Sequence, residues 1–275
     1  MSSLQPATVQ LSFEEFSRHG GLTGPHKDGW GIAFYEGGDV RLMREPGAAS
    51  DSAFARFVQE HPPASRLVLS HIRKATQGSN NLANCQPFAR ELGGRMHLFA
   101  HNGHLDRETL ALEFPLGVYQ PVGDGDSEHA FCALLDRMRT LWLRANGLPP
   151  VEERLQIVAN FARAIRPLGP ANFLYADSDT LFVHGHKRTH ADSIHPPGLH
   201  VLRRRCEQPP ATYRAEGLAI GLGTERQEVV LAASVPLTAE EAWQPIEEGE
   251  ILALRMGAIV GRALVSPRCA DTRLL

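Results

Sequence analysis

The stretch SEHAFCALLDRMRTLWLRA, residues 127–145, decides the fold class, because its apolar residues recur at helical spacing. A second stretch with the same spacing, VEERLQIVANFARAIR, covers residues 151–166. On both sides of these two predicted helices the chain carries short apolar runs bounded by Gly, Pro and Asn, which is typical of strands. Two long helices between two groups of strands predict sheets sandwiched with helices, rather than a doubly wound parallel sheet.

The strands expected before the helices include a hairpin. Residues 29–36 (GWGIAFYE) and 39–44 (DVRLMR) flank Gly37-Gly38, a two-residue turn signal. Strands are also expected at 66–73 and 95–101, with helices at 51–60 and, from a capping-box pattern, starting at Ser12. After the long helices, strands are expected at residues 172–176, 181–186, 199–204, 218–222, 229–233, 250–256 and 259–265.

The composition is that of an ordinary globular protein: 43% of the 275 residues are apolar and 21% charged. A net charge of −3 gives no reason to expect a nucleic-acid or anionic membrane partner, and no apolar run is long enough to span a bilayer. Without repeats or an obvious linker, we expect a single domain over residues 1–275. Four scattered cysteines and no signal-peptide pattern favour a reduced, cytoplasmic protein.

Three short polar motifs lie at the ends of predicted elements. Residues 73–76 (RKAT) follow a buried strand, residues 101–103 (HNG) follow the next, and residues 123–128 (GDGDSE) open the longest helix. Each has an ordinary explanation, namely a solvated Arg-Lys pair, a hairpin turn and a helix cap with acidic residues. However, the residues after Gly103 look helical, which weakens the hairpin explanation.

Taken together, the groups in these motifs describe a ligand. A guanidinium suits an α-carboxylate, and a carboxylate suits an α-ammonium group. An amide side chain beside a glycine N–H suits the oxyanion of an acyl-transfer reaction. These are the three ends of glutamine whose side-chain amide is to be cleaved.

The chain resembles class II glutamine amidotransferases, which are N-terminal nucleophile hydrolases, and within them the small stand-alone YafJ-like group. The resemblance covers nearly the whole chain. Its motifs are GPHKDGWGIAFYEG (24–37), SHIRKAT (70–76), NCQPF (84–88), AHNGHL (100–105), GDSEHAF (125–131) and PLTAEEAWQPIEEGE (236–250).

The resemblance implies an α+β fold, a four-layer α/β/β/α sandwich of two mainly antiparallel sheets, and it implies site residues. Arg73 would bind the α-carboxylate of glutamine, Thr76 would shape that end of the pocket, and Asp126 would bind the α-ammonium group. Asn102 and Gly103 would form the oxyanion hole. The segment 28–31 (DGWG) matches a motif expected to be structural.

In the family the nucleophile is an N-terminal cysteine whose own amine acts as the base. Here Ser2 is the second residue and the first cysteine is Cys85. We expect that the catalytic cysteine precedes Met1, on a central strand, and that the chain as given binds glutamine without cleaving it. Ser2 as nucleophile and a degenerate homologue that only binds are the alternatives.

Other candidate sites are weaker. The histidines between His184 and His200 are expected in a solvated loop rather than a metal site, and we expect no metal or cofactor. Cys132 is expected in the core, whereas Cys85 lies in a polar loop near the presumed pocket and could be reactive.

The expected activity is therefore hydrolysis of a γ-glutamyl amide through a cysteine thioester, as in a glutaminase. The ammonia would pass to a separate synthase partner. The alternatives are an amidase of γ-glutamyl conjugates without a partner and a non-catalytic glutamine-binding protein.

Overall fold

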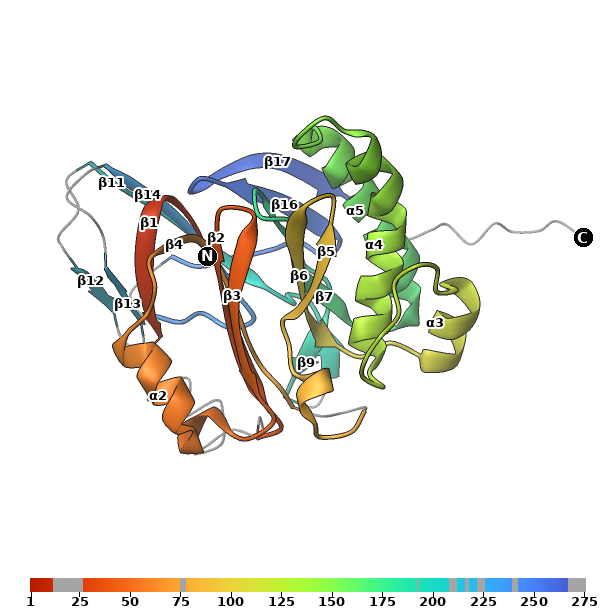
Figure 1. Ribbon diagram of the computed structural model, residues 1–275, viewed down its shortest axis with the longest axis horizontal. Coiled ribbons are helices and arrows are strands. Elements are labelled where there is room, and N and C mark those ends of the chain that lie inside the picture. Colours follow the sequence, from red (N-terminus) through yellow and green to blue (C-terminus); the bar gives the residue numbers. More distant parts are fainter. Residues whose placement is uncertain are drawn as a thin grey trace, which may run out of the picture.

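Two antiparallel sheets lie face to face in the computed structural model, and helices pack on their outer faces (Figure 1). The structure describes residues 1–11, 27–74, 78–191, 193–207, 212–215, 218–221, 226–238 and 242–266. The nine-stranded sheet contains, in spatial order, β15 (Gln244–Pro245), β11 (His200–Cys206), β14 (Gln227–Ala233), β1 (Ser2–Leu11), β4 (Ser65–Ile72), β2 (Trp30–Glu36) and β3 (Asp39–Glu45). On one side, β13 (Leu218–Gly221) pairs with β1 and with β12 (Thr212–Ala215).

The six-stranded sheet carries the two long helices. Its spatial order is β17 (Ala258–Leu264), β16 (Glu250–Arg255), β8 (Leu181–His184), β7 (Ala171–Ala176), β6 (Arg95–Gly103) and β5 (Phe88–Leu92). The helices are α2 (Ala53–Glu60), α3 (Arg107–Glu113), α4 (Asp126–Arg144) and α5 (Val151–Ile165). None of the described helices is long and apolar enough to cross a membrane.

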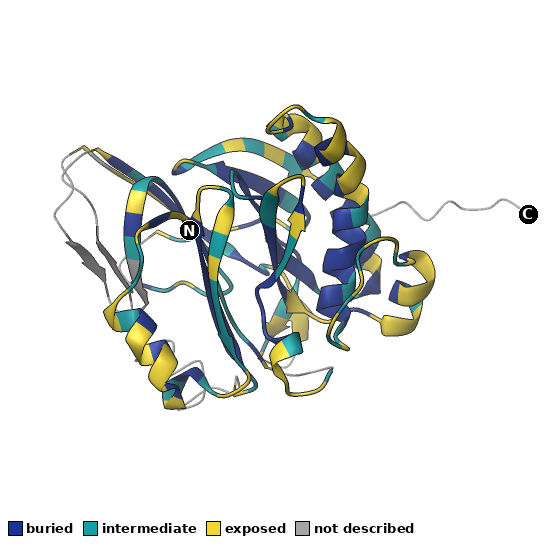
Figure 2. Ribbon diagram, in the orientation of Figure 1, coloured by how far each residue is buried: buried dark blue, intermediate teal, exposed yellow. Residues whose placement is uncertain are grey.

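Three apolar clusters fill the three spaces between four layers. One joins α4 and α5 to the six-stranded sheet and includes Phe131, Phe161 and Phe173. The second lies between the sheets, with Leu69 and Val183. The third lies on the outer face of the nine-stranded sheet, where α2 packs. Figure 2 shows the buried residues as bands along the inner faces of these layers. The clusters confirm the predicted α+β sandwich.

The predicted elements that lie within the described residues agree closely with the structure, although β5, β9 (Arg188–His190), β10 (Ser193–His195), β12 and β15 were not predicted. The predicted hairpin is β2 and β3, which pair from Trp30–Glu45 to Glu36–Asp39. Helix α4 buries its predicted apolar residues Phe131, Leu135 and Met138. The helix expected from Ser12 lies outside the described residues.

Strand β1 was not among the predicted strands, although it occupies a central position between β14 and β4. Met1 and Val68 exchange two backbone hydrogen bonds, of 2.8 Å from the Met1 amine and 3.1 Å from Val68 N–H. The α-amine is therefore buried in the sheet, and this burial lowers its pKa to about 5.

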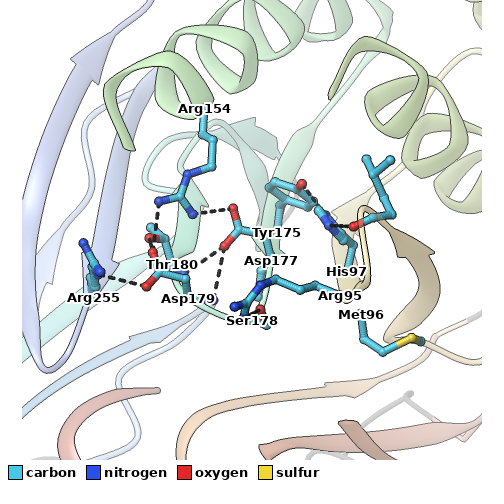
Figure 3. A network of polar contacts seen from close by, with 12 residues as sticks. Arg95, Met96, His97, Arg154, Tyr175, Asp177, Ser178, Asp179, Thr180 and Arg255 are labelled. Carbon is cyan, nitrogen blue, oxygen red and sulfur yellow. Dashed lines mark hydrogen bonds and ion pairs between the residues drawn. The ribbon is translucent and has the colours of Figure 1, made fainter. Parts of the chain in front are cut away.

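A buried polar network closes one end of the six-stranded sheet (Figure 3). Arg154 of α5 donates to Asp177 at 2.8 Å and to Asp179 at 2.9 Å, both in the turn between β7 and β8. Arg255 pairs with Asp179 at 3.0 Å. This turn follows Ala176, whereas the motif residues lie at the other end of β7, beside Ala171 and Asn172.

Candidate active site

Arg73 follows β4 and is held by the segment before β2. Its N–H donates to the Gly29 carbonyl at 2.8 Å and its carbonyl accepts from Asp28 N–H at 3.1 Å, which extends the β2–β4 ladder. The side chain is only 5% exposed. Its guanidinium donates to the Asp28 and Gly78 carbonyl oxygens, each at 3.3 Å. The ladder therefore fixes the backbone of Arg73, and the carbonyl oxygens of Asp28 and Gly78 hold its head group.

The DGWG segment packs tightly against the loop that follows Arg73. A Cβ atom on Gly29, whose φ is +130°, would lie 2.7 Å from Cys85 Sγ, and one on Gly31 would lie 2.2 Å from the Gln86 carbonyl oxygen. Such distances exclude any side chain at the two glycines without displacement of their neighbours. The motif thus has the structural role expected from the sequence.

Asp124 links the loop after Arg73 to the turn before α4. Its carboxylate accepts from Ser79 N–H at 2.9 Å and from the Ser79 hydroxyl at 2.7 Å, and Asn84 Nδ2 donates to it at 2.5 Å. These hydrogen bonds, with Ser79 first, hold the pKa of Asp124 below its usual range. Gly78, which accepts from Arg73, packs against Asp124 and Gly125. The segments carrying Arg73 and Asp126 are therefore connected.

Asp126 begins α4 without capping it. The N-cap is Gly125, which makes no side-chain cap, so the helix-cap explanation holds only for the acidic residues of the first turn, Asp126 and Glu128. The Asp126 carboxylate instead accepts from Leu105 N–H at 2.7 Å, just beyond β6. Asp126 is 6% exposed and thus presents a largely buried carboxylate next to the end of the HNG motif.

His101 connects the two motifs on the helix side of the sheet. Its Nε2 lies 3.1 Å from the Pro170 carbonyl, which makes Nε2 the protonated nitrogen, and Nδ1 accepts from the Ser127 hydroxyl at 2.9 Å. Burial lowers the pKa of His101, although the Asp126 carboxylate opposes this shift. His101 is therefore a neutral, hydrogen-bonded core histidine.

Asn102 and Gly103 end β6 as paired strand residues and not as a hairpin turn, opposite Asn172 and Ala171. A Cβ atom on Gly103 would lie 1.9 Å from the Pro170 carbonyl oxygen, so this position requires glycine. The exposed side chain of Asn102 donates to the Ser234 hydroxyl at 2.6 Å.

The structure thus connects Arg73 with Asp126 through Gly78 and Asp124, and Asp126 with the HNG motif through Leu105. The side chain of Gln86, from the NCQPF motif, adds a further link by accepting from His101 N–H at 2.6 Å. Thr76 lies outside the described residues.

Comparison with known proteins decides the family. The sequence profile of "Glutamine amidotransferases class-II" matches residues 1–272. The chain belongs to the class II glutamine amidotransferases. It is 37% identical over 253 residues to YafJ of Escherichia coli K12, which is named as a candidate glutamine amidotransferase. The match covers 91% of this chain and 93% of YafJ.

Solved structures agree. A predicted glutamine amidotransferase from Pseudomonas aeruginosa is 33% identical with a TM-score of 0.67, covering 94% of this chain and 97% of that one. The glutamine phosphoribosylpyrophosphate amidotransferase of Bacillus subtilis is 14% identical with a TM-score of 0.56. It shares the fold over 95% of this chain and 49% of its own length.

The surroundings of Ser2, Cys85 and Cys132 bear on whether any of these side chains could act as a nucleophile. The Ser2 hydroxyl is fully buried and accepts from Gly257 N–H at 3.1 Å. Cys85 is also fully buried, its thiol donates to the Glu45 carbonyl, and burial raises its pKa although Arg73 and Arg44 oppose this. The expected reactivity of Cys85 is therefore not supported. Cys132 is a core residue, as expected, and burial raises its pKa to about 12.

The histidine-rich segment differs from the expected loop. It contains a small hairpin of β9 (Arg188–His190) and β10 (Ser193–His195), in which the rings of His190 and His195 stack at 4.3 Å. Within the described part of the chain, no group of three metal-binding side chains gathers.

Sequence reasoning missed two residues that contact the HNG motif. The Asn172 side chain donates to the backbone carbonyl of Asn102, and the Ser234 hydroxyl accepts from the Asn102 side chain. Ser234 lies just before PLTAEEAWQPIEEGE, a motif noticed in the sequence without a role, and the only sequence signal for Asn172 is a polar residue in an apolar strand.

Proposed function

We propose that this amidotransferase binds glutamine, or another γ-glutamyl compound, between Arg73 and Asp126 and cleaves its side-chain amide. The observation that carries the proposal is the connection from Arg73 through Gly78 and Asp124 to the turn that bears Asp126. A buried guanidinium and a buried carboxylate held by one set of loops suit the two charged groups of an amino acid.

The chemistry follows from the groups beside this pair. A thiolate would attack the amide carbon, and the oxyanion that forms would accept hydrogen bonds from the Asn102 side chain and Gly103 N–H. The C–N bond then breaks, and ammonia leaves after receiving the thiol's proton. Water next cleaves the thioester and releases glutamate. The reaction needs no oxidant or reductant.

We further propose that the thiol belongs to a residue before Met1, so that the 275-residue chain binds glutamine without cleaving it. Strand β1 runs antiparallel to β4, and Arg73 lies five residues beyond Val68, the partner of Met1. At about 3.3 Å per residue, Met1 is roughly 17 Å short of Arg73 along the strand, and Ser2 is further still. A residue five positions before Met1 would continue the ladder to the level of Arg73.

Calorimetry and ammonia release test these proposals separately. Two proteins are compared: the chain itself, and the chain with a five-residue extension that begins with cysteine. Both should bind glutamine at millimolar concentration, but only the extended protein should release ammonia. The same extension with alanine for the cysteine is the control. If either protein fails to bind glutamine, the proposed glutamine site is contradicted. If the unextended chain releases ammonia, the proposed placement of the thiol is contradicted.

The mass and N-terminal sequence of the protein isolated from its source test the placement of the thiol independently. We expect an N-terminal cysteine upstream of Met1. A native protein that starts at Met1 or Ser2 would contradict this placement.

The ammonia acceptor can be addressed with the active protein. A partner-dependent amidotransferase should hydrolyse glutamine slowly alone and faster with its synthase, whereas an amidase should cleave a γ-glutamyl conjugate at full rate alone. A protein that binds glutamine but shows neither activity with its native N-terminus would be a non-catalytic binder.

A further inference from the structure

We propose that Asn172 and Ser234 are positioning residues that orient the two oxyanion donors, Gly103 N–H and the Asn102 side-chain amide. The inference rests on the proposed function, because it concerns the same site. It assigns a role in catalysis to two residues that touch neither the thiol nor the substrate.

Asn172 is completely buried on β7, and its side chain uses its hydrogen-bonding groups in one orientation. Its Nδ2 donates to the Asn102 carbonyl at 3.0 Å and to the Lys187 carbonyl at 2.6 Å. Its Oδ1 accepts from His186 N–H at 2.7 Å. Rotation of the amide by 180° would place its NH2 group against His186 N–H and its oxygen against the carbonyl oxygens of Asn102 and Lys187. The orientation of the amide is therefore fixed.

The contact with the Asn102 carbonyl determines the direction of Gly103 N–H. The two groups belong to the same peptide, which is planar, and in a trans peptide the C=O and N–H bonds point in opposite directions. A side chain that holds the Asn102 carbonyl on one side therefore aims Gly103 N–H to the other. Such a donor is oriented before the reaction begins and needs no reorganisation as the charge develops.

Ser234 acts on the second donor from the other sheet. It follows β14, and its hydroxyl accepts one of the two hydrogens on Asn102 Nδ2, at 2.6 Å. The amide group is planar, so fixing one N–H bond fixes the direction of the other. Asn102 is thus held by the six-stranded sheet through its backbone and by the nine-stranded sheet through its side chain.

A purely structural role for these contacts predicts different kinetics. Loss of a structural hydrogen bond lowers stability and leaves the rate of the folded enzyme unchanged. Loss of donor orientation lowers kcat without weakening glutamine binding, because the oxyanion exists only after attack on the amide.

The test uses the active enzyme with its native amino terminus and compares wild type with Asn172→Asp and Ser234→Ala. The carboxylate keeps the shape of asparagine but donates no hydrogen bond to the Asn102 carbonyl. We expect kcat for glutamine hydrolysis to fall about 10- to 100-fold in Asn172→Asp and about 3- to 10-fold in Ser234→Ala. The calorimetric Kd for glutamine should stay within about twofold of wild type in both.

Gln227→Glu is the matched control. Gln227 is a buried amide that bonds to the Gln5 backbone in the nine-stranded sheet, so the variant makes the same kind of change without touching Asn102. It should lose thermal stability but keep the wild-type kcat.

The outcomes separate the two proposals. If wild type releases ammonia and folded Asn172→Asp does so at the wild-type rate, the inference is overturned and the proposed function stands. If Asn172→Asp does not fold, Ser234→Ala decides, because its side chain is half-buried at the end of a strand: an unchanged kcat overturns the inference and a reduced one supports it. If wild type neither binds nor cleaves glutamine, both proposals fail.

Discussion

Arg73 illustrates how a single residue can be tested at this site. Its buried guanidinium is oriented by two carbonyl oxygens, so it is set to meet a carboxylate in fixed geometry. Arg73→Ala should weaken glutamine binding by about 2–5 kcal/mol, at least roughly 30-fold in Kd, because the carboxylate loses its partner in a buried site. Calorimetry measures this change.

Two further variants sharpen the Arg73 experiment. Arg73→Lys keeps the charge but cannot bind a carboxylate bidentately, and should give an intermediate Kd. Arg41→Ala removes an exposed arginine that pairs with Glu36 on the β2–β3 hairpin, and should leave Kd unchanged. A folded Arg73→Ala protein with wild-type affinity for glutamine would show that Arg73 does not bind the glutamine carboxylate.

His97 makes stability depend on pH. It is buried, accepts from Tyr175 OH at 2.7 Å and donates to the Leu92 carbonyl, and burial lowers its pKa to about 3. Below about pH 6.5, His97 takes up a proton in the unfolded chain but stays neutral in the folded protein. The free energy of unfolding therefore falls as the pH is lowered from about 6.5 towards 3. His184, with a pKa of about 3, adds to the same loss.

Urea unfolding of wild type and His97→Gln at pH 7.5 and 5.5 measures this effect. For wild type, the free energy of unfolding should fall by about 1 kcal/mol per buried histidine between these pH values. The fall should be smaller by about that amount in His97→Gln. Equal pH dependence in the two proteins would show that His97 takes up a proton in the folded state.

At the scale of elements, the sequence predicted those strands and helices whose apolar pattern is unbroken. The predicted ends of helix α4 and of both strands of the β2–β3 hairpin lie within one residue of the observed ends. Strand β1 was not predicted, because Gln5 and Pro6 interrupt its pattern, and only pairing with β4, β14 and β13 makes it a strand. Asn102-Gly103 carries a turn signal that pairing with β7 overrides.

The candidate site could be predicted only in part for a similar reason. Arg73 and Asn102 follow apolar runs and Asp126 opens a helix, and a polar residue at such an element end stands out in the sequence. Asn172 and Ser234 contact Asn102 from segments far away in the chain, and nothing in their local sequence indicates those contacts. The link through Asp124 depends likewise on two loops folding against each other.

That link gives the prediction at this scale. Asp124→Ala should detach the loop at Ser79 and Asn84 from the turn before α4, and so weaken glutamine binding several-fold by releasing the segment that contacts Arg73. Asp39→Ala, at an exposed hairpin turn, is the control. Calorimetry should show a raised Kd for the first variant alone. An unchanged Kd for Asp124→Ala would mean that the two loops hold the site independently.

At the scale of the whole molecule, β7 carries two polar clusters, one near each of its ends. Asn172, near its first residue, contacts Asn102, whereas Asp177, just after its last, anchors α5 through Arg154. Six strand residues span about 20 Å, so the two polar clusters share one strand without contact. The cluster around Arg154 should therefore govern unfolding, and the other end of the sandwich should govern ligand binding.

Arg154→Ala tests this separation. The change leaves Asp177 buried without its cation, so the free energy of unfolding should fall by about 3–5 kcal/mol in urea titrations. Glutamine binding by the folded fraction, measured at low temperature, should keep the wild-type Kd. Arg144→Ala, which breaks an exposed pair with Glu153, should cost at most about 1 kcal/mol. A weakened Kd in Arg154→Ala would show that the two ends of the sandwich are coupled through β7, and a loss of stability no larger than that of Arg144→Ala would show that water or a neighbouring group replaces the buried cation.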